Sequence, residues 1–290
     1  MGCAVMDKDL PEWSAYGSPD AGAGITLSHS ISGQGSPVLL IHGYGASSYS
    51  WRYVIEPLSR NHQVITLDLK GFGNSPKPRD DMYSVYDQAR LVRNFIVDQN
   101  LKDLTIIGHS FGGGVALVTS VYLEASHPGL IDKLVLIDNV AYPQKLPASV
   151  KILATPVLGP LAVHLLPNST QVKILLKEVY FDDALIPQEA INHYAENLAK
   201  PNAKYAILTS ARQLIPRDLD QFSLNYARLK IPTLVIWSRE DEMLPLEIGQ
   251  RLHAELPNSE LVILDNVGHA AQEENPALIL PLLQNFLDTD

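Results

Sequence analysis

Cysteine, long apolar stretches and positive charge are all scarce in this sequence. Cys3 is the only cysteine among 290 residues, so an internal disulfide and a cysteine-based metal cluster are excluded. The longest apolar stretch, residues 152–166, is broken by proline and glycine and is too short to cross a membrane as a helix. The first ten residues lack the segments of a secretory signal, and Met6 stands where a myristoylation signal needs Ser or Thr. We therefore expect a cytoplasmic protein without a stable membrane anchor.

The charge balance excludes a further class of protein. Lys and Arg number 22 against 32 Asp and Glu, which gives a net charge of −10. Nucleic-acid binding rests on clustered Lys and Arg, so we expect no nucleic-acid partner, and the same balance argues against docking on anionic lipid. The chain also has no H-E-x-x-H pair, no phosphate-binding loop and no dinucleotide fingerprint. We expect neither a metal nor a cofactor.

Short apolar runs alternate with amphipathic stretches in the first half of the chain. The runs cover residues 38–41, 64–67, 104–107 and 134–137, and each ends at His, Asp or Gly. Apolar and polar residues do not alternate within them, which is typical of strands covered on both faces. Repetition of strand and helix predicts an α/β fold with a mostly parallel central sheet and helices on both faces.

This pattern stops after Asp138 and resumes near residue 232, with a last strand at 261–264. The intervening residues form amphipathic, proline-punctuated segments of helical period. They are too many for a connecting loop. The sequence therefore predicts a core domain from residues 1–138 and 231–290, and an inserted helical cap domain at 139–230.

A candidate nucleophile lies in Gly108-His109-Ser110-Phe111-Gly112, a G-x-S-x-G pentapeptide. A buried strand is predicted directly before it and a helix of small residues directly after it, which is the setting of a nucleophile elbow. In such a turn the two glycines remove side chains that would collide where strand and helix meet. Ser110 is the predicted nucleophile.

A serine nucleophile needs a base, and a third group must hold that base. His269 follows the last predicted strand, so it can reach the carboxyl edge of the sheet, and we expect it to be the base. His109 adjoins the serine but is expected to point away from it across the turn. His42 is expected to brace its own loop.

Residues near the ends of other predicted strands are the candidates for the acid and for the oxyanion hole. Asp241 lies on a short loop past a predicted strand and is the expected acid. Asp138 is the alternative, because it also ends a strand; otherwise it would anchor the entry to the insertion. Backbone N–H groups of Phe111, after the nucleophile, and Tyr44, in the loop after an earlier strand, are expected to form the oxyanion hole.

Together these residues resemble the α/β-hydrolase fold superfamily, in its group with a helical cap. The motifs that carry the resemblance are His42-Gly43-Tyr44-Gly45, Asp68-Leu69-Lys70-Gly71-Phe72-Gly73-Asn74-Ser75, the serine pentapeptide, Asp241 with Pro245, and Gly268-His269. They extend over nearly the whole chain. Within this pattern Asp68 and Ser75 are expected to shape a loop below the elbow.

The resemblance implies a serine hydrolase that cleaves a small-to-medium apolar ester. C–C bond hydrolysis of the meta-cleavage type, cofactor-free haloperoxidase or perhydrolase activity, and a ligand receptor on the same fold are the alternatives. Epoxide hydrolases and haloalkane dehalogenases of this superfamily attack with an aspartate where this chain has Ser110. The expected partner is a small apolar molecule, and the expected oligomeric state is a monomer or homodimer.

Overall fold

The computed structural model describes residues 16–18 and 24–289. The expectations about Cys3 and the N-terminal signals lie outside this part of the chain. Within it, no single helix is both long enough and apolar enough to cross a membrane, and one bent pair, with 106° between its helices, meets that criterion only jointly.

A seven-stranded sheet forms the centre of the described chain, in the order β1-β3-β2-β4-β5-β6-β7. Only the edge strand β1 is antiparallel to its neighbour; the other pairs are parallel. All four apolar runs of the sequence are strands, and the predicted α/β fold is confirmed. The strands are β1 (His29–Ser32), β2 (Pro37–Ile41), β3 (Gln63–Leu67), β4 (Leu104–His109), β5 (Ile131–Ile137), β6 (Thr233–Ser238) and β7 (Ser259–Leu264).

Helices cover both faces of the sheet, and β2 shows why its sequence is continuously apolar. Leu39 and Ile41 belong to one buried cluster, whereas Val38 and Leu40 belong to another. Successive side chains of a strand point to opposite faces, so each face of β2 is packed. The first cluster includes α2 (Val85–Asp98), α3 (Ser110–Ser126) and α10 (Leu246–Glu255); the second includes η2 (Ser48–Trp51), α1 (Arg52–Ser59), α11 (Ala271–Glu274) and α12 (Pro276–Asp288).

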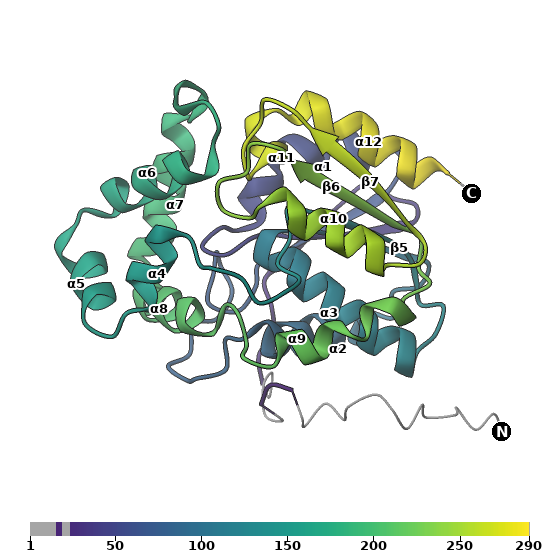
Figure 1. Ribbon diagram of the computed structural model, residues 1–290, viewed down its shortest axis with the longest axis horizontal. Coiled ribbons are helices and arrows are strands. Elements are labelled where there is room, and N and C mark those ends of the chain that lie inside the picture. Colours follow the sequence, from purple (N-terminus) through teal and green to yellow (C-terminus); the bar gives the residue numbers. More distant parts are fainter. Residues whose placement is uncertain (1–15, 19–23, 290) are drawn as a thin grey trace.

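Between β5 and β6 the chain forms helices. Figure 1 shows α4 to α8 as a lobe beside the sheet, on the side away from both termini, while α9 lies next to α2. A small buried cluster joins α6 to α7 within the lobe. The division of the chain into two domains remains a prediction. The helices are α4 (Ala148–Ala154), α5 (Leu158–Leu165), α6 (Asn168–Val179), η3 (Asp183–Leu185), α7 (Gln188–Ala199), α8 (Ala203–Gln213), α9 (Leu219–Ser223) and η4 (Tyr226–Arg228).

The turn from β4 into α3 brings backbone segments unusually close together. A Cβ atom on Gly108 would lie 2.6 Å from Cα of Gly113, and one on Gly112 would collide with the carbonyl oxygens of Ile41 and His42. Such contacts are far inside van der Waals distance. Glycine is therefore required at both positions for the strand and the helix to meet.

We expect Gly112→Ala to lower the free energy of unfolding by about 2–3 kcal/mol, because the added methyl group collides with backbone that cannot move aside. Gly129→Ala is the control: its Cβ meets open space, and it carries only the cost of a positive φ, about 1 kcal/mol. Urea unfolding of both variants measures the difference. Equal losses would mean that the elbow relaxes around the methyl group.

Candidate active site

Ser110 occupies the sharpest point of the turn between β4 and α3. Its φ is +54°, a left-handed conformation that is costly for a residue with a side chain. Ser110 is also the first residue of α3, so the first amides of that helix, which have no acceptor inside it, lie beside the hydroxyl. The turn thus places a serine oxygen next to unpaired backbone donors.

His269 lies in the loop between β7 and α11, within hydrogen-bond distance of the serine. Its Nε2 is 2.7 Å from Oγ of Ser110. The backbone N–H of His269 donates to the carbonyl of Val179, at the end of α6, over 2.8 Å. The inserted segment therefore holds the loop that carries the imidazole, which the sequence pattern did not indicate.

Glu274 strengthens the same connection. Its carboxylate accepts the N–H of Gly268 at 2.7 Å and those of Phe181 and Asp182 at 3.1 and 2.9 Å. One side chain thus joins the residue before His269 to the residues after α6. The position of the imidazole is fixed from the core and from the insertion together.

Asp241 lies on the other side of the imidazole. Its Oδ2 is 2.7 Å from Nδ1 of His269, while Oδ1 accepts the N–H groups of Met243 and Leu244 at 2.7 and 2.9 Å. Three donors orient this carboxylate. The structure thus brings the three predicted residues into one hydrogen-bonded chain, from the carboxylate through the imidazole to the serine, in which the histidine can accept the serine proton.

Asp138, the alternative acid, does not contact His269. Its carboxylate accepts the backbone N–H and the hydroxyl of Ser238, at 2.8 and 2.9 Å, so it ties the end of β5 to the end of β6. The idea that it anchors the entry to the insertion is therefore corrected. Burial and the nearby Asp241 raise the pKa of Asp138 well above its usual value, against the two hydrogen bonds.

His109 lies beside the site, where its side chain contacts the loop of His269. Its Nε2 donates to the backbone carbonyl of His269 over 2.7 Å, and the two rings are 4.9 Å apart. Burial and the neighbouring His269 hold the pKa of His109 well below the usual histidine value. A neutral His109 therefore supports the His269 loop from below.

Two other expected supports lie beside the site. His42 accepts the N–H of Leu69 through Nε2, at 3.0 Å, and donates from Nδ1 to the carbonyl of Gly43. Asp68 accepts the N–H groups of Ser48 and Asn74, both at 2.7 Å. These bonds hold the loops after β2 and β3 in place beside the serine, where both loops line the cavity.

Ser75 is a further support of the loop after β3. Its hydroxyl donates to the carbonyl of Asp68 over 2.5 Å and accepts the N–H of Ser28 over 2.8 Å. The loop after β3 is thereby closed on itself and tied to the chain before β1. This agrees with a shaping role for Asp68 and Ser75.

A cavity of about 270 Å³ opens above Ser110 and His269. Tyr44 and Phe111 both line it, and the hydroxyl of Tyr44 donates to the carbonyl of Ile207 in α8 over 2.9 Å. The rest of the wall is mainly apolar and comes from the insertion: Val150, Ile152, Leu153, Val163, Leu166, Val172, Ile174, Leu175, Leu176, Val179, Leu198 and Leu214 are among the lining residues.

A largely buried ion pair beside the cavity was not predicted from the sequence. Arg52, at the start of α1, donates from Nη1 to Glu273 over 2.6 Å, and the hydroxyl of Tyr194 in α7 donates to the same carboxylate over 2.9 Å. Arg52 also lies 4.3 Å above the ring of Tyr49. Glu273 and Tyr194 line the cavity, so this cluster joins the core, the insertion and the chain after His269.

Burial raises the pKa of Glu273, while Arg52 and the hydroxyl of Tyr194 act in the opposite direction. Arg52 and Glu273 are 221 residues apart in the sequence, and no motif links them. The run of two glutamates after His269 was the one available signal. Within residues 16–18 and 24–289, no group of three or more His, Cys, Asp or Glu side chains is arranged to hold a metal ion.

The family assignment follows from comparison with known proteins. A family model described as the alpha/beta hydrolase fold matches residues 36–276. The chain belongs to this family, and the resemblance seen in the sequence motifs is confirmed. This chain is 32% identical over 252 residues to the uncharacterized hydrolase YugF of Bacillus subtilis, and the aligned region covers 86% of this chain and 89% of that protein.

This chain is also similar to proteins whose names state an activity. The chain is 30% identical over 268 residues to a 2-hydroxymuconate semialdehyde hydrolase of Pseudomonas putida, covering 88% of each. A putative lipase from Acinetobacter baumannii superposes with a TM-score of 0.76 at 28% identity, over 92% of this chain and 88% of that one. A meta-cleavage product hydrolase from Pseudomonas fluorescens gives 0.79 at 24% identity, over 92% and 96%, which is a likeness of fold.

We expect Asp241→Asn to keep the fold and lower kcat by up to about 10⁴, because the amide no longer orients or charge-stabilises the imidazole. Asp138→Asn should leave kcat near that of the wild type, because Asp138 does not contact His269, and should lower the free energy of unfolding by about 1–3 kcal/mol, because the amide offers one acceptor to the two donors of Ser238. Steady-state kinetics and melting temperature of the two variants test this. A collapse of kcat in Asp138→Asn, with Asp241→Asn near wild type, would reverse the two roles.

The buried pair gives a second prediction. Arg52→Met should lower the free energy of unfolding by about 3–5 kcal/mol at neutral pH, because Glu273 is left buried without its cation. The folded-state pKa of Glu273 then rises further above its unfolded value, so the folded state binds more protons and the loss should grow as pH increases from 5 to 8. Urea unfolding at both pH values measures this.

The double variant Arg52→Met, Glu273→Leu is the control for that experiment. It removes both charges and should recover most of the lost stability, with the pH dependence gone. If the double variant were as unstable as Arg52→Met alone, lost packing of the arginine side chain would be the cause.

Proposed function

We propose that this protein is a serine hydrolase that cleaves a small-to-medium apolar carboxylic ester through an acyl-enzyme. The observation that carries the proposal is the hydrogen-bonded chain of Asp241, His269 and Ser110, with both links at 2.7 Å. A chain of this geometry serves nucleophilic acyl transfer on several unrelated folds. The family match supplies the same general class, that of α/β hydrolases.

The residues have separate roles in this proposal. Oγ of Ser110 attacks the ester carbonyl carbon while Nε2 of His269 takes the serine proton. The oxyanion that forms accepts hydrogen bonds from the N–H groups of Tyr44 and Phe111. When the C–O bond breaks, the alcohol leaves with the proton from His269. A water molecule then attacks the acyl-enzyme by the same route, releasing the acid and restoring Ser110.

The cavity favours a neutral, apolar substrate of modest size. Its volume of about 270 Å³ is just below the usual range of roughly 300–1,000 Å³ for small-molecule sites. Leucine, valine and isoleucine side chains of the insertion form most of the wall above the serine. Because the strand and loop residues below are occupied by the triad and its supports, the insertion would set the choice of acyl or alcohol group.

C–C bond hydrolysis is the second candidate, because relatives about 30% identical carry that kind of name. One is a hydrolase of a hexa-2,4-dienoic acid, an anion at neutral pH. Among the described residues that line the cavity here, Lys77 is the one Lys or Arg, and its ammonium group already donates to the carbonyls of Phe72, Gly73 and Ser75. Glu273 adds a carboxyl group to the wall. This lining favours a neutral ester over an anionic substrate.

We expect wild-type protein to hydrolyse p-nitrophenyl esters with an initial burst, and to favour short and medium acyl chains over long ones. Ser110→Ala should keep the fold and lose on the order of 10⁶ in kcat, since the nucleophile is absent. A fluorophosphonate probe should label Ser110 in the wild type alone. Labelling of another residue, or full activity of the alanine variant, would contradict the proposal.

The same experiment separates the alternatives. A meta-cleavage dienoate, assayed in parallel, should give a lower kcat/KM than the best ester. A higher value would favour the C–C hydrolase. Binding of esters without a burst and without turnover would favour a ligand receptor on this fold.

A further inference from the structure

The outermost helix of the inserted lobe exposes an apolar face. Leu158, Leu161 and Leu165 are spaced as one side of a helix and are 54%, 48% and 75% exposed, whereas Gly159 and Val163 of the same helix are buried. The helix is thus apolar on its buried and on its exposed side, whereas a helix at a protein surface usually exposes polar side chains. Figure 1 shows α5 at the end of the molecule farthest from both termini.

This face continues to the active-site cavity. Ile152 of α4, Leu166 after α5 and Ile174 of α6 are each close to half exposed, and the same three residues line the cavity. Together with Val157, they and the three leucines of α5 make up what we call the apolar face. Exposed apolar surface that is continuous with a ligand cavity marks an interaction site.

The segment that carries the apolar face is positively charged, unlike the chain as a whole, and the acidic residues of the lobe all follow it, at positions 178, 182, 183, 189 and 196. Residues 139–177 contain four lysines and no Asp or Glu. Lys177 is ion-paired with Asp183, which leaves Lys145, Lys151 and Lys173 as the other positive charges of that stretch.

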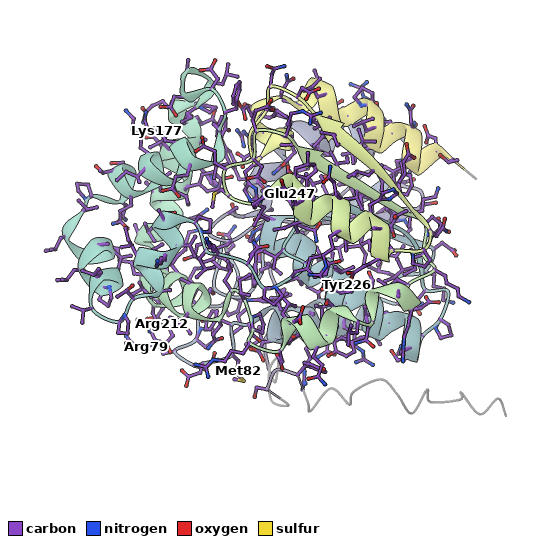
Figure 2. All side chains as sticks on the ribbon, in the orientation of Figure 1. Arg79, Met82, Lys177, Arg212, Tyr226 and Glu247 are labelled. Carbon is purple, nitrogen blue, oxygen red and sulfur yellow. The ribbon has the colours of Figure 1, made fainter. Side chains whose placement is uncertain are left out.

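The neighbouring helix extends this positive charge. Helix α8, which packs against α4, adds Lys204 and Arg212 and has no acidic residue. Figure 2 labels Lys177 in the upper part and Arg212 in the lower part of the lobe, on either side of the level of α5. Because Lys177 is paired with Asp183, the positive charge added here lies on the side of α8, at Lys204 and Arg212.

We propose that the apolar face docks peripherally on an anionic lipid bilayer, so that apolar esters pass from the lipid into the cavity. Exposed leucines would enter the boundary between headgroups and acyl chains, while the flanking lysines would pair with anionic headgroups. A second copy of the chain fits this surface less well, because two such faces would bring like charges together and cover the residues at the cavity entrance. The net charge of −10 that argued against lipid binding is a sum over residues 139–177, which carry +4, and the remainder of the chain, which carries −14.

The binding test uses Ser110→Ala protein, so its result does not depend on the proposed reaction. Flotation with vesicles of phosphatidylcholine and phosphatidylglycerol, and with pure phosphatidylcholine, measures partitioning. We expect at least about tenfold stronger binding to the anionic vesicles, and loss of that preference in about 0.5 M salt. In the Ser110→Ala background, a variant with Leu158, Leu161 and Leu165 changed to Ser should bind at least about tenfold more weakly.

Matched controls separate binding through the apolar face from nonspecific hydrophobic binding and from general electrostatic attraction. Leu224 is 75% exposed, like Leu165, but lies outside residues 139–177, so Leu224→Ser should leave binding unchanged. Lys151→Glu with Lys173→Glu should lower binding at least about 25-fold, since each lysine near the surface contributes about fivefold. Lys102→Glu, between α2 and β4, should have little effect.

An activity measurement completes the test in the wild-type background. The triple serine variant should keep its rate on a dissolved short-chain ester, because none of the three leucines lines the cavity, and should lose rate on an ester embedded in anionic vesicles. A wild type inactive on both esters would contradict the proposed function alone. Vesicle binding that is absent, or unaffected by the leucine and lysine changes, would overturn the docking proposal, as would dimerisation abolished by the triple serine change.

Discussion

The close approach of β4 and α3 at Ser110 is the constraint on which the rest of the site depends. Ser110 has φ of +54°, which costs on the order of 1–2 kcal/mol for an L-residue and persists only because strand and helix are both packed in the core. Gly108 and Gly112 allow the backbone segments to meet without side chains between them. The strained turn presents the hydroxyl at the carboxyl edge of the sheet, beside the free amides of the helix.

The imidazole depends on a second, longer-range connection. The N–H of His269 donates to the carbonyl of Val179, and Glu274 binds amides on both sides of the boundary between core and insertion. The ion pair of Arg52 with Glu273 joins the same parts. Helices that form the cavity wall thus also hold the loop of the proposed base. Changes in the lobe can therefore alter the orientation of His269 as well as the shape of the cavity.

Local patterns predicted six of the seven strands, all but the edge strand β1, and identified Ser110, His269 and Asp241, because apolar runs and the serine pentapeptide are readable within a few residues. The Arg52–Glu273 pair was not predictable in this way, because its partners meet only after the chain has folded. The partner of His109 was not predictable for the same reason. Chain order indicates which side of a turn a side chain leaves from, but the loop of His269, which receives its hydrogen bond, approaches from the far end of the sequence.

The uneven distribution of charge has a consequence for orientation. The lysines of residues 139–177 and the absence of acidic residues there leave the remainder of the chain more acidic than its total of −10 indicates. Near an anionic surface, the acidic remainder is repelled while residues 139–177 are attracted, so the field turns the α5 end toward the lipid before contact. The apolar face then determines whether the encounter lasts. In this arrangement the uneven charge sets the orientation of approach and the apolar face holds the protein on the lipid, and the cavity entrance is the part of the molecule that meets the bilayer.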